Sequence, residues 1–76
     1  MSHFREKIQK TETYQGLDPF QREMTMSKTN RLHIEHGVTV ALNSGLEYFE
    51  KTNPQYSERN KNIIREIYLS NQKKSA

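Results

Sequence analysis

Small residues recur at every fourth position between residues 37 and 45, and this pattern constrains the fold more than any other feature of the chain. We call this row, Gly37, Ala41 and Gly45, the small-residue strip. Side chains four positions apart lie on one face of a helix, so the strip predicts a helix that a second backbone can approach closely. A row of larger apolar residues runs beside it: Val38, Leu42, Leu46 and Phe49.

Residues 31–42 fit two backbone conformations, and the choice between them decides the fold class. Apolar and polar residues alternate there around His36-Gly37, so one alternative is an α+β fold with a β-hairpin at residues 31–42. The helical interpretation accounts for more residues, because apolar positions continue at helical spacing to Phe49. We therefore predict an all-α fold, a small bundle of three to four helices with a C-terminal antiparallel helical hairpin.

The chain is expected to form a single small helical domain, residues 1–76, which helix start and stop signals divide into separate helices. Asp18 followed by Pro19 is typical of a helix N-terminus, and the helix that begins there is predicted to turn Phe20 and Met24 inward. This helix is expected to extend at least to Lys28. The helix that carries the small-residue strip is predicted to continue to about residue 52.

The two ends of the chain and the segment around Pro54 have their own signals. Residues 1–16 hold few apolar side chains, so we expect a weakly ordered N-terminal helix. Pro54 disfavours helical geometry in the residue before it, and Ser57 is a good cap for a new helix. That last helix, residues 58–72, is predicted to turn its isoleucines inward and to end in a frayed basic tail, residues 73–76.

Two segments resemble known helical motifs. LEYFEK (residues 46–51) followed by NPQY (residues 53–56) resembles the junction between consecutive tetratricopeptide repeats, which implies two helices folding back on each other around Pro54. GVTVALN (residues 37–43) resembles the turn and recognition helix of helix-turn-helix repressors. It departs from that motif at His33, which stands where the tight crossing needs a small residue.

Low apolar content favours association with another chain. Only 32% of the 76 residues are hydrophobic. A chain this short buries only about 60% of the surface that its unfolded form exposes, so its stability margin is expected to be thin. Cysteine is absent, so disulfides cannot compensate. We expect a homo-oligomer or a complex with a protein partner, which makes a non-catalytic protein–protein interaction module the predicted function. Small regulators, inhibitors and adaptors from phage or bacterial accessory genes commonly have this format. The predicted interface residues are Gly37, Ala41, Gly45, Tyr48, Tyr14 and Phe4.

The net charge of +3 raises nucleic-acid binding as an alternative function. Basic residues are in excess only near the C-terminus, at Arg59, Lys61, Arg65, Lys73 and Lys74. Acidic residues are interleaved almost everywhere else, and polyanion affinity depends on clustered cations, so we expect weak binding at most.

The sequence holds few residues that indicate a metal site, a cofactor site or a membrane segment. His33 and His36 are three positions apart, but Zn²⁺ needs three or four ligands, so we predict surface histidines and no metal. Neither a glycine-rich phosphate loop nor a nucleophile motif occurs, so we expect no enzyme and no cofactor.

No apolar run is long enough to cross a bilayer, and the N-terminus lacks the apolar segment of a signal peptide. The sequence therefore predicts a cytoplasmic protein without membrane contact.

Overall fold

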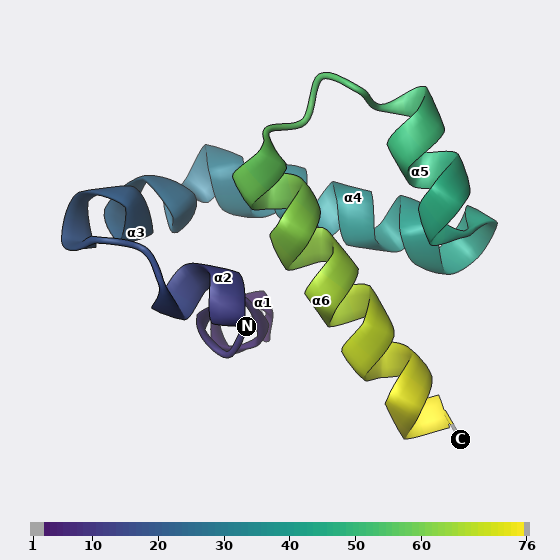
Figure 1. The fold of residues 1–76 in the computed structure, drawn as a ribbon, viewed down its shortest axis with the longest axis horizontal. Coiled ribbons are helices and arrows are strands. Elements are labelled where there is room, and N and C mark those ends of the chain that lie inside the picture. Colours follow the sequence, from purple (N-terminus) through teal and green to yellow (C-terminus); the bar gives the residue numbers. More distant parts are fainter. Residues whose placement is uncertain (1–2, 76) are drawn as a thin grey trace.

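A computed structural model describes residues 3–75 of the chain, with side chains as far as Lys73. Within that range the chain forms six helices and no strand, so the predicted all-α class is confirmed. Residues 31–42 lie inside one long helix, and the β-hairpin alternative is therefore wrong. The helices, arranged as Figure 1 shows, are α1 (Phe4–Gln9), α2 (Glu12–Gln15), α3 (Pro19–Thr25), α4 (Lys28–Ser44), α5 (Leu46–Thr52) and α6 (Glu58–Ser75).

The core forms where α4 and α6 cross. Both helices are amphipathic, and the predicted inward face of α6 is confirmed because its three isoleucines are buried. In Figure 1, α6 crosses α4 obliquely near the middle of α4, while α5 folds back beside the C-terminal half of α4. The buried apolar residues are Ile8, Ile34, Val38, Ala41, Phe49, Tyr56, Ile63, Ile64 and Ile67.

Gly37 lies at this crossing and sets how closely the helices approach. A Cβ atom added to Gly37 would lie 2.5 Å from Cδ1 of Ile64 and 3.1 Å from the ring of Phe49. Both neighbours are completely buried, so neither can move into solvent. The close approach expected from the small-residue strip therefore occurs within the chain, where α6 and Phe49 fill the space.

Gly45 ends α4 instead of extending it. Its backbone has φ 100° and ψ 146°, a conformation that side-chain-bearing residues rarely adopt. The single helix expected through residue 52 is therefore wrong, because the chain turns at Gly45 and starts again as α5. Because of this turn, the Phe49 ring lies in the core against Gly37. Helix α5 then ends at Thr52, before Pro54 as predicted.

The N-terminal third divides into shorter helices than expected. Asp18 caps α3 as predicted, its side chain accepting a hydrogen bond from the Gln21 backbone N–H at 2.8 Å. That helix ends at Thr25, because Ser27 caps a new helix by accepting from the Asn30 backbone N–H. The predicted extension to Lys28 is wrong.

A pair of side-chain amides joins α4 to α6. Asn60 Nδ2 donates to Asn30 Oδ1 at 2.9 Å, and Asn30 Nδ2 donates back to Asn60 Oδ1 at 3.2 Å. Asn60 is 3% exposed, so both hydrogen bonds to Asn30 are needed to satisfy its side-chain polar atoms. Asn30 Nδ2 also donates to the backbone oxygen of Thr25, which ties the end of α3 to the same point.

We predict that Gly45→Ala lowers the free energy of unfolding by about 1–3 kcal/mol, because alanine is strained at a positive φ. Nothing lies within 4 Å of a Cβ at Gly45, so the cost comes from the backbone alone. Gly16→Ala is the matched control, since Gly16 has φ −85° and only ordinary contacts around a Cβ. Urea denaturation should show that control unchanged or stabilised by about 0.4–1 kcal/mol. Equal effects of the two substitutions would contradict this account.

We also predict energetic coupling between Asn30 and Asn60. Asn60→Ala should cost about 1–3 kcal/mol, because it leaves polar atoms of Asn30 unsatisfied. A double-mutant cycle with Asn30→Ala should give a coupling energy of about 0.5–3 kcal/mol. Additive losses in urea denaturation would show that the amide pair does not act as a unit.

Candidate functional site

Polar side chains hold α3 against the rest of the molecule. Arg59 Nη1 on α6 donates to Gln21 Oε1 at 2.9 Å, and Arg22 Nη2 donates to the backbone oxygen of Gln15 at 2.7 Å. Thr25 is completely buried and donates its hydroxyl hydrogen to the backbone oxygen of Gln21. The inward face of α3 is therefore built from Gln21 and Thr25.

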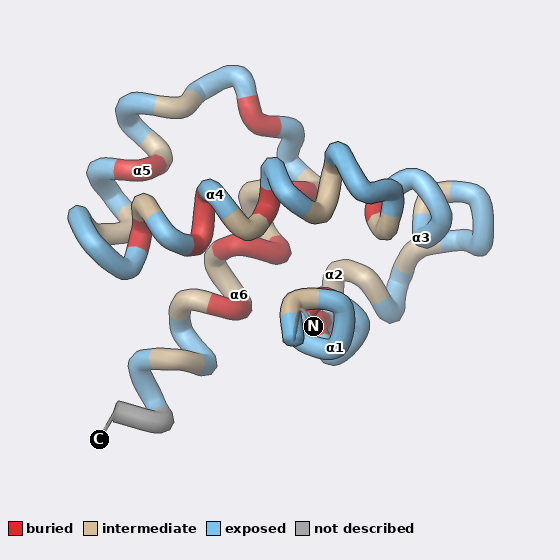
Figure 2. The backbone as a smooth tube through the Cα atoms, turned by 180° about the vertical axis from the view of Figure 1, so that it is seen from behind, coloured by how far each residue is buried: buried red, intermediate tan, exposed pale blue. Residues whose placement is uncertain are grey.

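The apolar side chains of α3 consequently face solvent. Phe20 is 66% exposed and Met24 is 47% exposed, so the predicted inward orientation of both is wrong. They lie four positions apart and share one face of the helix. We call this pair the α3 surface. Figure 2 shows α3 at the edge of the molecule, with most of its backbone coloured as exposed.

Other large apolar side chains are also exposed, but they are spread over the remaining helices. They are Leu32 and Leu42 on α4, Tyr48 on α5 and Leu69 on α6. Single exposed apolar side chains are normal on a soluble surface. The α3 surface differs because two such side chains lie one helical turn apart on a helix whose polar contacts fix its orientation.

The small-residue strip is largely enclosed by the chain itself. Gly37 and Ala41 are buried between α4 and its neighbours, whereas Gly45 is part of the turn between α4 and α5. In this structure the three residues therefore do not form one open face.

The aromatic residues predicted at an interface fall in two environments. Tyr48 is 53% exposed on α5 and is accessible to a partner. Phe4 and Tyr14 are half-buried and pack against the core. The Arg22 guanidinium lies 5.5 Å from the Tyr14 ring.

Most of the basic residues proposed for nucleic-acid binding contact other parts of the chain. Arg65 Nη2 pairs with Glu50 Oε2 at 2.6 Å, and Lys61 Nζ lies 3.5 Å from Glu58 Oε2. Arg59 contacts α3, and its Nε is buried. Lys73 is exposed, and the side chain of Lys74 lies outside the described residues. These internal contacts reduce the basic surface available to a polyanion.

His33 and His36 lie on α4 in different surroundings. The His33 ring stacks on Tyr56 with centroids 3.8 Å apart, and the Tyr56 hydroxyl donates to the His33 backbone oxygen at 3.0 Å. Burial raises the pKa of Tyr56 above its usual value of 10.0. His36 is exposed. Among residues 3–75, no three His, Cys, Asp or Glu side chains gather as a metal site would require.

Comparisons with known proteins return no relative: no family model, no curated protein and no solved structure matches the chain. None of the helices in the described range is long and apolar enough to cross a membrane.

The outward orientation of Phe20 on α3 leads to a testable prediction about the free energy of unfolding. Phe20→Ala should change the free energy of unfolding by less than about 0.5 kcal/mol, because that ring is mostly in solvent. Phe49→Ala, at a fully buried ring, should cost about 3–5 kcal/mol. Urea denaturation followed by circular dichroism measures both. A loss of more than about 2 kcal/mol from Phe20→Ala would show that its ring is buried instead.

Proposed function

We propose that this protein is a small non-catalytic binding module that inserts Phe20 and Met24 of α3 into an apolar groove of a partner protein. The observation that carries the proposal is the 66% exposure of Phe20 in a chain with few apolar residues. A role as regulator, inhibitor or adaptor falls within this proposal.

Burial of the α3 surface supplies part of the binding free energy. Fully burying an exposed Phe or Met contributes about 1.5–3 kcal/mol. Since Phe20 and Met24 already bury part of their surface, we expect about 1–2 kcal/mol from each. Aromatic anchors of this kind commonly dominate an interface, while the polar rim around them supplies specificity.

The polar contacts beneath α3 support binding by keeping the helix in one orientation. Hydrogen bonds from Arg22 and Arg59 fix α3 before any partner arrives. A preorganised helix loses less conformational entropy on binding than a flexible segment does. Anchors at positions i and i+4 are typical of a helix that occupies a groove.

A different protein is a better occupant than a second copy of this chain. A cleft of this chain, between α1 and α6, is lined mainly by polar and charged side chains. Phe20 and Met24 would not find an apolar groove there. Two copies would also bring together molecules of the same net charge, +3.

The test compares capture of partners by three forms of the full chain. Wild type and the variant Phe20→Ser/Met24→Ser are used as baits in extracts of the native host, with quantitative mass spectrometry. Leu69→Ser is the matched control, because Leu69 is 52% exposed on α6. A protein enriched by wild type and by the control, but not by the double variant, is then purified for calorimetry.

We expect the double variant to bind that partner at least about tenfold more weakly, corresponding to about 1.4 kcal/mol or more. The control should bind within about twofold of wild type. Equal affinity of wild type and double variant would overturn the proposal. Sedimentation velocity adds a second criterion, since a homodimer that the double variant loses would assign the α3 surface to self-association instead.

A further inference from the structure

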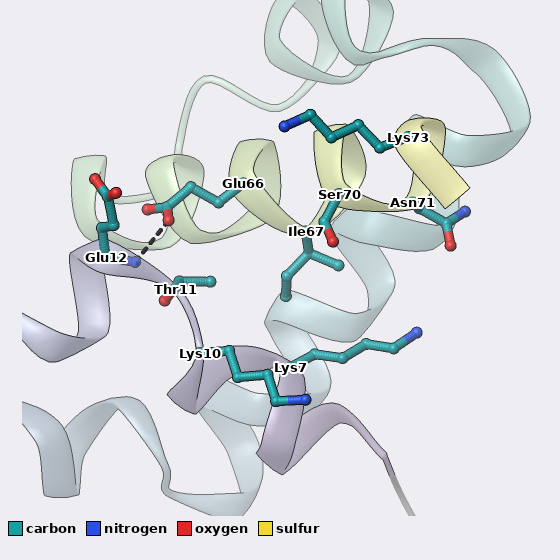
Figure 3. Close-up of a pocket in the computed structure, with 9 residues that line it drawn as sticks. All are labelled: Lys7, Lys10, Thr11, Glu12, Glu66, Ile67, Ser70, Asn71 and Lys73. Carbon is teal, nitrogen blue, oxygen red and sulfur yellow. Dashed lines mark hydrogen bonds between the residues drawn. The ribbon is translucent and has the colours of Figure 1, made fainter. Parts of the chain in front are cut away.

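A polar cleft lies between α1 and the C-terminal half of α6. Its volume is about 490 Å³, and its lining includes three lysines, Lys7 and Lys10 from the N-terminal segment and Lys73 from α6. Figure 3 shows α6 along one side of the cleft and α1 along the other. A volume of this size accommodates a small molecule.

The carboxylate of Glu66 faces the same cleft but is already engaged. Its Oε1 accepts from the Glu12 backbone N–H at 2.6 Å, and its Oε2 accepts from the Thr13 backbone N–H at 3.0 Å and the Thr13 hydroxyl at 2.6 Å. These donors belong to the first turn of α2, where backbone N–H groups have no partner within the helix. The charge of Glu66 is thus compensated by α2 and not by the lysines.

The three cleft lysines form no ion pair with other described residues, in contrast to Lys61 and Arg65 earlier in α6. Lys61 and Arg65 pair with carboxylates, whereas Lys7 has its Nζ 5.3 Å from the Phe4 ring. Lys7, Lys10 and Lys73 are all exposed. Glu12 also lines the cleft, so three lysines stand against two carboxylates. Since Glu66 is already held by α2, the remaining excess of positive charge favours an incoming anion.

The rest of the lining comes from α6 and from Thr11 and Glu12 at the start of α2. Ile67 is 5% exposed and forms an apolar floor, and Ser70 and Asn71 line the cleft beside it. In Figure 3 the Ser70 hydroxyl points toward the α1 side. Hydroxyl and amide groups can donate hydrogen bonds to anionic oxygens, and lysine binds phosphate as a point charge.

From this arrangement we propose that the cleft binds a small phosphorylated molecule, with its phosphate groups at the lysines. The site is made by α1 and α6 and uses no residue of the α3 surface. It is therefore a second binding function that does not depend on the proposed protein partner.

Inorganic pyrophosphate is the probe, and NMR amide shifts of the full chain are recorded at constant ionic strength. Saturable shifts are expected at Thr11, Ser70 and Asn71. The variant Lys7→Gln/Lys10→Gln should raise the Kd at least about tenfold. Lys28→Gln/Lys51→Gln is the matched control, because it removes two exposed lysines on α4 and α5, and its Kd should stay within about twofold.

Two results would overturn the proposal. Shifts that rise linearly and spread equally to Lys28 and Lys51 would show nonspecific charge attraction. Unchanged affinity in Lys7→Gln/Lys10→Gln would show that pyrophosphate binds elsewhere. Circular dichroism of both variants should match wild type, because the four substituted side chains are exposed.

Discussion

The contact between Gly37 on α4 and Ile64 on α6 is the constraint on which the rest of the fold depends. With a hydrogen atom in place of a side chain, α4 admits Ile64 and the Phe49 ring to the same point. That point joins the three C-terminal helices, so α4, α5 and α6 share one small core. Tyr56 extends it, because its ring meets Phe49 edge-on with centroids 4.9 Å apart.

The limited supply of apolar residues explains why α3 is attached differently. The crossing of α4 and α6 uses most of the buried isoleucine and valine side chains. α3 is held by Gln21, Thr25 and arginine side chains instead, so its own Phe20 and Met24 stay outside. Hydrogen bonds depend on direction as well as contact, so they help to hold this seven-residue helix in a defined orientation.

The long helices could be predicted from the sequence because their signals are local. Apolar spacing predicted the buried face of α6, and Asp18 and Ser57 cap helices as their residue types indicate. Gly45 was misassigned because it continues the period-four pattern, and a pattern of side chains carries no information about φ. The orientation of α3 was missed for a related reason, since the spacing of Phe20 and Met24 shows that they share a face but not which way it points. Contacts of Gln21 with Arg59 depend on residues 38 positions apart, which local patterns do not report.

The bond between Glu66 and the start of α2 also bears on the order in which the chain assembles. It joins groups 53 and 54 positions apart, whereas α4, α5 and α6 follow one another directly. Long loops cost more entropy to close than short ones, so we expect the C-terminal three helices to form first and the N-terminal segment to dock last. Until that docking step, Lys7 and Lys10 of the N-terminal segment do not face the polar groups of α6. The polar cleft between α1 and α6 is therefore present only in the completely folded molecule. A ligand that binds only this state would stabilise the contact between the N-terminal segment and α6.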